Sequence, residues 1–163
     1  MKTYRIAVIA GDGIGKEVVP AGIDVLNLAA EHGGFRCEFT QIPWGCDYYL
    51  QHGRMMDEDG VDRLMKFDAI YLGAIGDPRV ADHISARELF LPLRQGLGQW
   101  VNLRPMRLLP GISSPLAGRS AADIDMVCVR ENSEGEYCGI GGRLHRGTPQ
   151  EVAEQTGVFT GHG

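Results

Sequence analysis

This sequence contains no long apolar run and no excess of basic residues, and both absences narrow what the protein can do. The apolar stretch near the N-terminus, residues 4–10, is far shorter than the roughly 20 residues that cross a bilayer, and it is too short for a secretion signal. The net charge of -5 argues against nucleic acid or an anionic membrane as the main partner, because phosphate binding needs a basic face. The sequence therefore predicts a soluble, cytoplasmic protein with no nucleic-acid and no membrane partner.

Cysteines at metal-binding spacing are absent too, and lysine is scarce. Cys37, Cys46, Cys128 and Cys138 form no C-x-x-C pair, so we expect reduced thiols rather than a zinc site. There are three lysines and thirteen arginines. Arginine offers a planar fork that suits carboxylates, but an arginine-rich codon usage explains the same imbalance, so the count alone assigns no ligand.

Short apolar strands alternate with helices in the first hundred residues. Strands are expected at 4–10, 35–42 and 68–72, and helices at 18–30, 48–51, 57–66 and 85–95. Such alternation predicts right-handed crossovers and a doubly wound, largely parallel α/β sheet.

The pattern changes in the remaining third of the chain. Strands are expected at 100–109 and 125–130, a loop at 110–118, and extended segments at 137–145 and 151–160, with no convincing helix. We therefore divide the chain into residues 1–98, the N-terminal part of a first α/β domain, and 99–163, the start of a second domain with a β-rich arm. A hairpin-rich arm without a covering helix is expected to pack on a partner subunit.

The turn GDGIGKE, residues 11–17, follows the first strand directly. It is not a dinucleotide fingerprint, because its third glycine comes one residue early, and it is not a P-loop, because Lys16 is followed by Glu17. We interpret it as a tight strand-to-helix turn whose free N–H groups at the helix N-terminus can face an anion.

Three arginines stand near the ends of different predicted elements: Arg94 in LPLR, Arg104 in NLRP and Arg130 in VREN. They could converge on a small polycarboxylate, or they could be solvated surface arginines. The segment RENSEGEY also places Tyr137 near acidic and basic groups, where a phenol can take part in proton transfer.

Several motifs resemble one family in their order along the whole chain. GDGIGKEV, LGAIGDP, LPLR, VNLRPMRLLPG and VRENSEGEYCGIGGR resemble the β-decarboxylating dehydrogenases, which include the isopropylmalate, isocitrate, homoisocitrate, tartrate and D-malate enzymes. CDYYLQHGRMM and DHIS resemble the tartrate and D-malate branch most. The resemblance implies oxidation of a 2-hydroxy acid by NAD with decarboxylation assisted by Mg²⁺ or Mn²⁺.

The resemblance also implies roles for individual residues. Arg94, Arg104 and Arg130 would clamp the carboxylates of a small hydroxy-dicarboxylate substrate, and Tyr137 would relay a proton in catalysis. Ile75 in the GAIGDP loop and Asn102 would be cofactor-binding residues.

The stretch 88–91 would contact the substituent on the third carbon of the substrate. The family usually has a small residue and two leucines there, whereas this chain reads LFLP, with a proline inside the predicted helix. This departure leaves the substrate specificity open.

Other parts of the family's active site have no counterpart here. The catalytic lysine, the metal-binding aspartates and the GSAPDI-like adenosine loop do not occur, and no lysine follows Lys66. We therefore expect no metal ligand in this chain, a partly open core, no dehydrogenase activity from the chain alone, and a homodimer formed through the arm at 137–160. An isopropylmalate- or isocitrate-type dehydrogenase, a non-catalytic remnant or regulatory subunit, and an unrelated α/β binding domain remain as alternatives.

Overall fold

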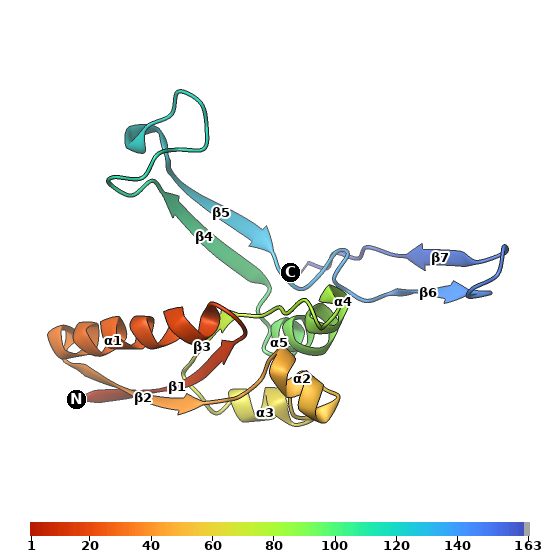
Figure 1. Cartoon of the computed structure of the whole chain (residues 1–163), viewed down its shortest axis with the longest axis horizontal. Helices are drawn as coiled ribbons and strands as arrows, with labels where there is room; N and C mark the ends of the chain where they lie inside the picture. The colour runs from red at the N-terminus through yellow and green to blue at the C-terminus, as the bar shows by residue number, and fades with distance from the viewer. Residues whose placement is uncertain (162–163) are drawn as a thin grey trace. The chain divides into compact units, whose positions relative to one another are not determined.

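Figure 1 shows the computed structural model of the chain, which describes residues 1–161. The contacts divide it into two compact units, Met1–Leu97 and Gly98–Gly163. This boundary falls one residue before the one predicted from the sequence. None of the helices in residues 1–161 is both long and apolar enough to cross a bilayer.

The first unit is built on three parallel strands. Its elements in chain order are β1 (Lys2–Gly11), α1 (Gly15–Gly33), β2 (Phe35–Gln41), α2 (Cys46–His52), α3 (Gly60–Leu64), β3 (Ala69–Ala74), α4 (Asp82–Ser85), the π-helical turn η1 (Ala86–Phe90) and α5 (Leu91–Gly96). The strand order is β2-β1-β3, and Ile6 lies opposite Phe39 on one side and Ala69 on the other. The predicted α/β fold with a parallel sheet is confirmed.

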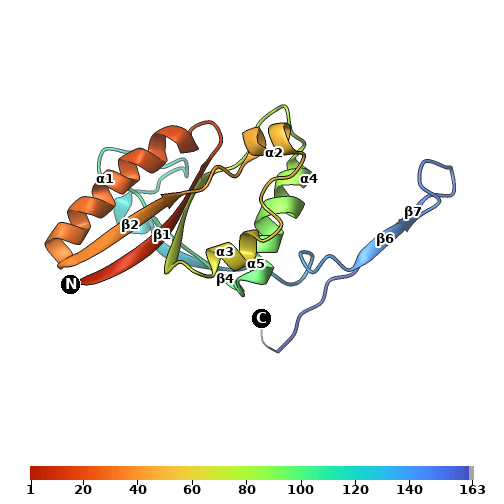
Figure 2. The same cartoon turned by 90° about the horizontal axis from the view of Figure 1, so that it is seen from below.

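β1 is the central strand, and its side chains alternate between two cores. Ala7 and Ile9 pack into a cluster with residues of α3, η1 and α5, whereas Ile6 and Val8 pack against Val19 of α1. Figure 2 shows α1 on one face of the sheet and α2, α3, α4 and α5 on the other. Because both faces are covered, β1 is apolar along its whole middle instead of alternating between apolar and polar residues.

Part of this unit remains uncovered. Val18, Val25 and Leu28 of α1 are exposed, as are Ile14 just before α1 and Leu72 of β3. Among the described residues, neither β2 nor β3 has a neighbour on its outer edge. Both observations agree with the expectation that part of this core is open.

The predicted helix at 85–95 is not one continuous α-helix. It is divided into α4, the π-helical turn η1 and α5, and the N–H of Leu91 donates to the carbonyl of Ala86. Pro92 therefore stands in the first turn of α5. A proline is tolerated there because the first N–H groups of a helix have no partner within it. The π turn thus resolves the misfit between LFLP and an uninterrupted helix.

The second unit consists of two antiparallel hairpins. Its elements are β4 (Val101–Arg107), a 3-10 turn η2 (Ala121–Asp123), β5 (Asp125–Glu131), β6 (Gly141–Leu144) and β7 (Val152–Gln155). β4 pairs with β5 and β6 pairs with β7. The strands predicted at 100–109 and 125–130 are confirmed. In the described part of this unit, η2 is the only helical turn, as expected.

Candidate functional site

The β4–β5 ladder brings several of the predicted site residues onto one surface. Asn102 lies opposite Arg130, and Arg104 lies opposite Cys128. Side chains alternate along a strand and directly paired residues project to the same side, so these four residues share one face of the ladder. We call this face, made by Asn102, Arg104, Cys128 and Arg130, the arginine face. Within it, Arg104 Nε donates a hydrogen bond to Asn102 Oδ1 at 3.1 Å.

Tyr137 adjoins the arginine face through Arg130. Arg130 Nη2 donates a hydrogen bond to Tyr137 Oη, and the guanidinium carbon lies 5.4 Å from the centroid of the tyrosine ring. The phenol oxygen accepts this bond, and a tyrosine hydroxyl can both accept and donate hydrogen bonds. The arrangement therefore places a phenol in direct contact with the Arg130 guanidinium.

The turn after β5 holds this arrangement in shape. Glu131 Oε1 accepts hydrogen bonds of 2.8 Å from the N–H groups of the three residues that follow it. The N–H groups of Ser133 and Glu134 lower the pKa of Glu131. The Glu131 carboxylate therefore stabilises the turn by accepting its backbone N–H groups. Buried Asn132 donates from Nδ2 to the carbonyl of Gln99 at 2.8 Å, which ties the turn to the segment before β4.

Arg94 lies in the other unit, on α5. It is half-buried, and its guanidinium carbon is 5.5 Å from the centroid of the Phe90 ring, one helical turn earlier. Its convergence with Arg104 and Arg130 stays a prediction, because it belongs to the first unit and they belong to the second.

The GDGIG turn is organised around Asp12, whose exposure is only 3%. Its carboxylate accepts hydrogen bonds from the N–H of Cys46 at 2.9 and 3.0 Å and from the N–H of Gly76 at 3.0 Å. Its own N–H donates to the carbonyl of Ala74 at 2.7 Å. Asp12 therefore joins the loops that follow β1, β2 and β3.

The N–H groups at this helix N-terminus, which the sequence suggested could face an anion, are largely bonded within the turn. The N–H groups of Gly15, Lys16 and Glu17 donate to the carbonyls three residues earlier at 2.9, 3.2 and 3.0 Å. These short-range bonds close the first turn and leave no row of free donors for an anion. Nearby, burial and the Asp12 carboxylate raise the pKa of the Cys46 thiol to about 12, so Cys46 is an inert thiol rather than a nucleophile.

Ile75 lies on the loop after β3, and its side chain is half-buried against the core that contains Trp44 and Leu89. The same loop joins an ionic network at the surface. The network contains the pairs Lys16–Asp47 at 2.6 Å, Arg79–Asp47 at 2.7 Å and Arg79–Asp77 at 2.7 Å. The Arg79 guanidinium lowers the pKa of Asp77 to about 2.

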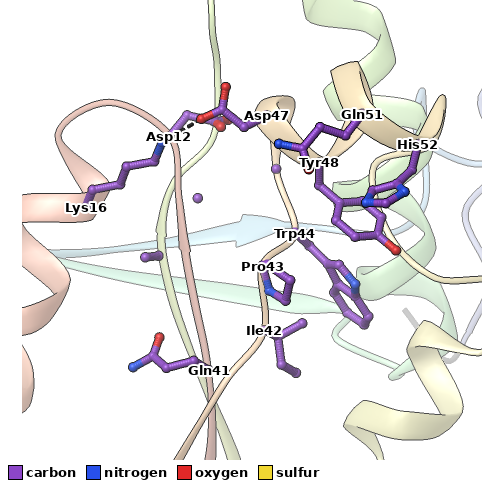
Figure 3. A pocket seen from close by; sticks show the side chains of 13 residues that line it. Asp12, Lys16, Gln41, Ile42, Pro43, Trp44, Asp47, Tyr48, Gln51 and His52 are labelled. Carbon is purple, nitrogen blue, oxygen red and sulfur yellow. Dashed lines mark hydrogen bonds and ion pairs between the residues drawn. The ribbon is translucent and has the colours of Figure 1, made fainter.

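A cavity of about 600 Å³ opens beside the carboxyl ends of β1 and β2. Figure 3 shows its wall, with Lys16 pointing toward Asp47 and with Tyr48 and His52 projecting from α2. None of the site residues predicted from the sequence lines it. The charged groups of the cavity wall already have protein partners, because Lys16 pairs with Asp47 and Asp12 accepts backbone N–H bonds. A ligand in this cavity would therefore be held by its fit to the wall rather than by an unpaired charged side chain.

Within residues 1–161, no three histidine, cysteine, aspartate or glutamate side chains come together in a group that could hold a metal ion. The described residues therefore do not fit a divalent cation by themselves, since such ions need several oxygen or nitrogen ligands.

Comparison with known proteins accounts for the sequence motifs. The D-malate dehydrogenase (decarboxylating) of Escherichia coli K12 is 54% identical over 165 aligned residues, which cover 100% of this chain and 46% of that protein. The probable tartrate dehydrogenase/decarboxylase of Bacillus subtilis is 53% identical over 162 residues, which cover 98% of this chain and 45% of that protein. The chain thus spans less than half the length of these relatives.

Solved structures and a family profile agree with these relatives. An isocitrate dehydrogenase from Methylococcus capsulatus superposes with a TM-score of 0.74 at 26% identity and covers 96% of this chain, which corresponds to 43% of that structure. A β-decarboxylating dehydrogenase from Thermococcus kodakarensis gives a TM-score of 0.56 at 35% identity, over 95% of this chain and 41% of that structure. The profile of the isocitrate/isopropylmalate dehydrogenases matches residues 5–162. This chain therefore belongs to the isocitrate/isopropylmalate dehydrogenase family.

Proposed function

We propose that this chain supplies the carboxylate-binding surface of an NAD-dependent enzyme that oxidises and decarboxylates a malate- or tartrate-like 2-hydroxy acid. The observation that carries the proposal is the arginine face, which places Arg104 and Arg130 on one side of a ladder, with Tyr137 hydrogen-bonded to Arg130. Guanidinium forks suit the two carboxylates of such a substrate. The names of the D-malate and tartrate dehydrogenase relatives support this substrate class.

In this proposal, Arg104 and Arg130 bind and orient the substrate carboxylates, and Arg94 adds a third contact. NAD would be held by the loop after β3 and the start of β4, and it would supply the hydride acceptor for oxidation of the carbinol carbon. Loss of CO₂ from the resulting keto acid would leave its bonding electrons on the substrate as an enolate. The Tyr137 hydroxyl would then deliver a proton to the enolate carbon. The bond from Arg130 holds the phenol oxygen in place for this transfer.

The loop after β3 and the start of β4 would provide this chain's contacts to NAD, through Ile75 and Asn102. Gly76 is exposed, and a side chain added there would meet no other atom within 4 Å. Its backbone is therefore open to the close approach of a flat ring. The described residues do not fit Mg²⁺ or Mn²⁺, so we assign no metal ligand and no metal-dependent step to them.

We also propose that the arm at 137–160 forms a homodimer. β6 and β7 are exposed throughout, and Ile140, Leu144, Val152 and Phe159 are 51%, 66%, 55% and 70% exposed. An isolated two-stranded hairpin is only marginally stable in water, so a second copy of the arm would supply the missing contacts. The bond from the Gly135 N–H to the Val158 carbonyl extends the ribbon beyond the two strands.

A non-catalytic subunit that binds a carboxylate is the second candidate. The absence of a metal-holding group among residues 1–161 favours it for this chain taken alone. For the same reason we expect the purified 163-residue chain to produce no NADH from D-malate or tartrate when NAD and Mn²⁺ are supplied.

Cys128 provides the test of carboxylate binding, because it is an exposed thiol on the arginine face, whereas Cys46 is buried. We would measure the alkylation rate of each cysteine by mass spectrometry, with and without D-malate, tartrate or 3-isopropylmalate. The preferred hydroxy acid should slow alkylation at Cys128 but not at Cys37, which lies in the other unit. An unchanged rate at Cys128 with all three acids would place the substrate elsewhere. Protection without turnover in the full-length protein would favour the non-catalytic subunit.

A further inference from the structure

We propose that Asp12 is a positioning residue for the coenzyme. Its buried carboxylate fixes the loop 74–78, so removal of its charge weakens NAD binding and leaves hydroxy-acid binding unchanged. The inference rests on the proposed function, in which this loop lies against the nicotinamide. Asp12 itself touches neither coenzyme nor substrate in this scheme.

Asp12 holds the loop on both sides of Ile75. Its main-chain N–H donates to the carbonyl of Ala74 at 2.7 Å, and its Oδ2 accepts from the N–H of Gly76 at 3.0 Å. The backbone of Ile75 is therefore clamped between two bonds to one residue. An exposed glycine-containing loop is otherwise free to vary its backbone angles, so this clamp decides which surface the loop presents.

The same carboxylate is anchored a second time, on the loop after β2. Both of its oxygens lie within hydrogen-bond distance of the Cys46 N–H, at 2.9 and 3.0 Å. Gly45 has a φ of +151°, and a side chain added there would come within 2.9 Å of Asp12 Oδ1. The loop after β2 therefore approaches the carboxylate closely, and Asp12 couples it to the loop after β3.

The clamp depends on charge as well as on shape. An ionised carboxylate has only acceptors and can satisfy several N–H donors at once, and such bonds are stronger than neutral ones. Asparagine fills the same space, but it turns an NH₂ group toward N–H donors. The surface pairs Lys16–Asp47 and Arg79–Asp77 also support the loop, but exposed ion pairs of this kind contribute little. Asp12 is therefore the main buried link.

The experiment compares Asp12→Asn with Asp24→Asn in the full-length protein that the proposed function requires. Asp24 is exposed on α1 and undergoes the same chemical change without these contacts. For Asp12→Asn, we expect the dissociation constant and the KM for NAD to rise about tenfold. The KM for the hydroxy acid should stay within about twofold, because the arginine face does not depend on Asp12. Unchanged NAD affinity, or an equal loss for both ligands, would overturn the proposal and leave Asp12 a scaffold residue.

Hydrogen exchange supplies a readout that does not depend on activity or on folding of the variant. In the unmodified protein, the amides of Gly76 and Cys46 should both be protected, and saturating NAD should slow both, since one carboxylate holds them. Protection of Gly76 alone would contradict the clamp. If the unmodified protein binds no NAD, the proposed function fails, whereas the exchange of these two amides without NAD still tests the clamp itself.

Discussion

Replacing Arg104 by lysine tests the arginine face most directly. Arg104 is exposed and donates from Nε to Asn102 Oδ1 at 3.1 Å. This bond fixes the plane of the guanidinium and leaves its terminal amino groups to grip a carboxylate as a fork. Lysine keeps the charge but offers neither the fork nor the planar Nε donor.

The expected loss follows from the bonds removed. One charge-assisted hydrogen bond contributes about 1.5–3 kcal/mol. The dissociation constant for the hydroxy acid should therefore rise roughly tenfold to a hundredfold. The stability of the protein should change by no more than about 0.5 kcal/mol, because the side chain is exposed and its hydrogen-bond partner, Asn102, lies two residues away on the same strand.

The assay is competition between the hydroxy acid and an alkylating reagent at Cys128, with the KM of the full-length protein as a second readout. Arg107→Lys is the matched control. Arg107 is on the same strand, but it projects to the opposite face and pairs with Asp125 at 2.9 Å. An unchanged dissociation constant for Arg104→Lys would remove Arg104 from the site. An equal effect of Arg107→Lys would show that overall positive charge, rather than the arginine face, binds the acid.

Three further predictions concern the arm, the first turn and the surface network. Deletion of residues 141–155 should convert a dimer into a monomer in sedimentation analysis, and a monomeric unmodified protein would contradict the arm's role. Gly11→Ala should lower the free energy of unfolding by about 1–3 kcal/mol more than Gly13→Ala, because both have a positive φ but only the side chain at position 11 meets neighbouring atoms; equal losses in denaturant unfolding would refute this. In Arg79→Gln, the pKa of Asp77 should rise from about 2 toward 3.8 in an NMR titration. Because the pKa of Asp77 is lowered in the folded state, the ionised Asp77 carboxylate stabilises the protein above pH 3.8, and this contribution is lost as the pH falls toward 2. A pKa of Asp77 that does not move in the variant would exclude the Arg79 guanidinium as the cause.

The strands of the first unit could be predicted because their residues carry the signal locally. Residues 6–9 of the apolar run are buried on both faces of the sheet, and this requires a central strand with helices on either side. The break near Pro92 could not be located in the same way. A proline predicts an interruption, but the π turn that accommodates it depends on the packing of Leu89 and Leu93 in the core.

The arginine face could also be predicted in part. Arg104 and Arg130 stood out by motif, and the antiparallel register supplies the reason why they share a face. The role of Asp12 could not be predicted, because its partners are backbone N–H groups 34 and 64 residues away. Nearly every residue type carries a backbone N–H, so the sequence does not show which residues would bond to Asp12. Of the acidic groups in the RENSEGEY segment, the Glu131 carboxylate closes a turn through backbone hydrogen bonds, which the residue types alone do not reveal.

The π-helical turn Ala86–Phe90 has a consequence for how this chain is compared with its relatives. Such a turn holds one residue more than an α-helical turn, and each helical residue advances about 100° around the axis. It is the arrangement that a single-residue insertion leaves behind when both flanking segments keep their packing. An alignment with a relative whose helix is uninterrupted must open a one-residue gap between 86 and 90. Without that gap, Arg94 is aligned with the residue next to its true equivalent in the relative, whose side chain points about a quarter-turn away around the helix. An arginine that occupies the same position in space in both proteins then looks as if it had been replaced.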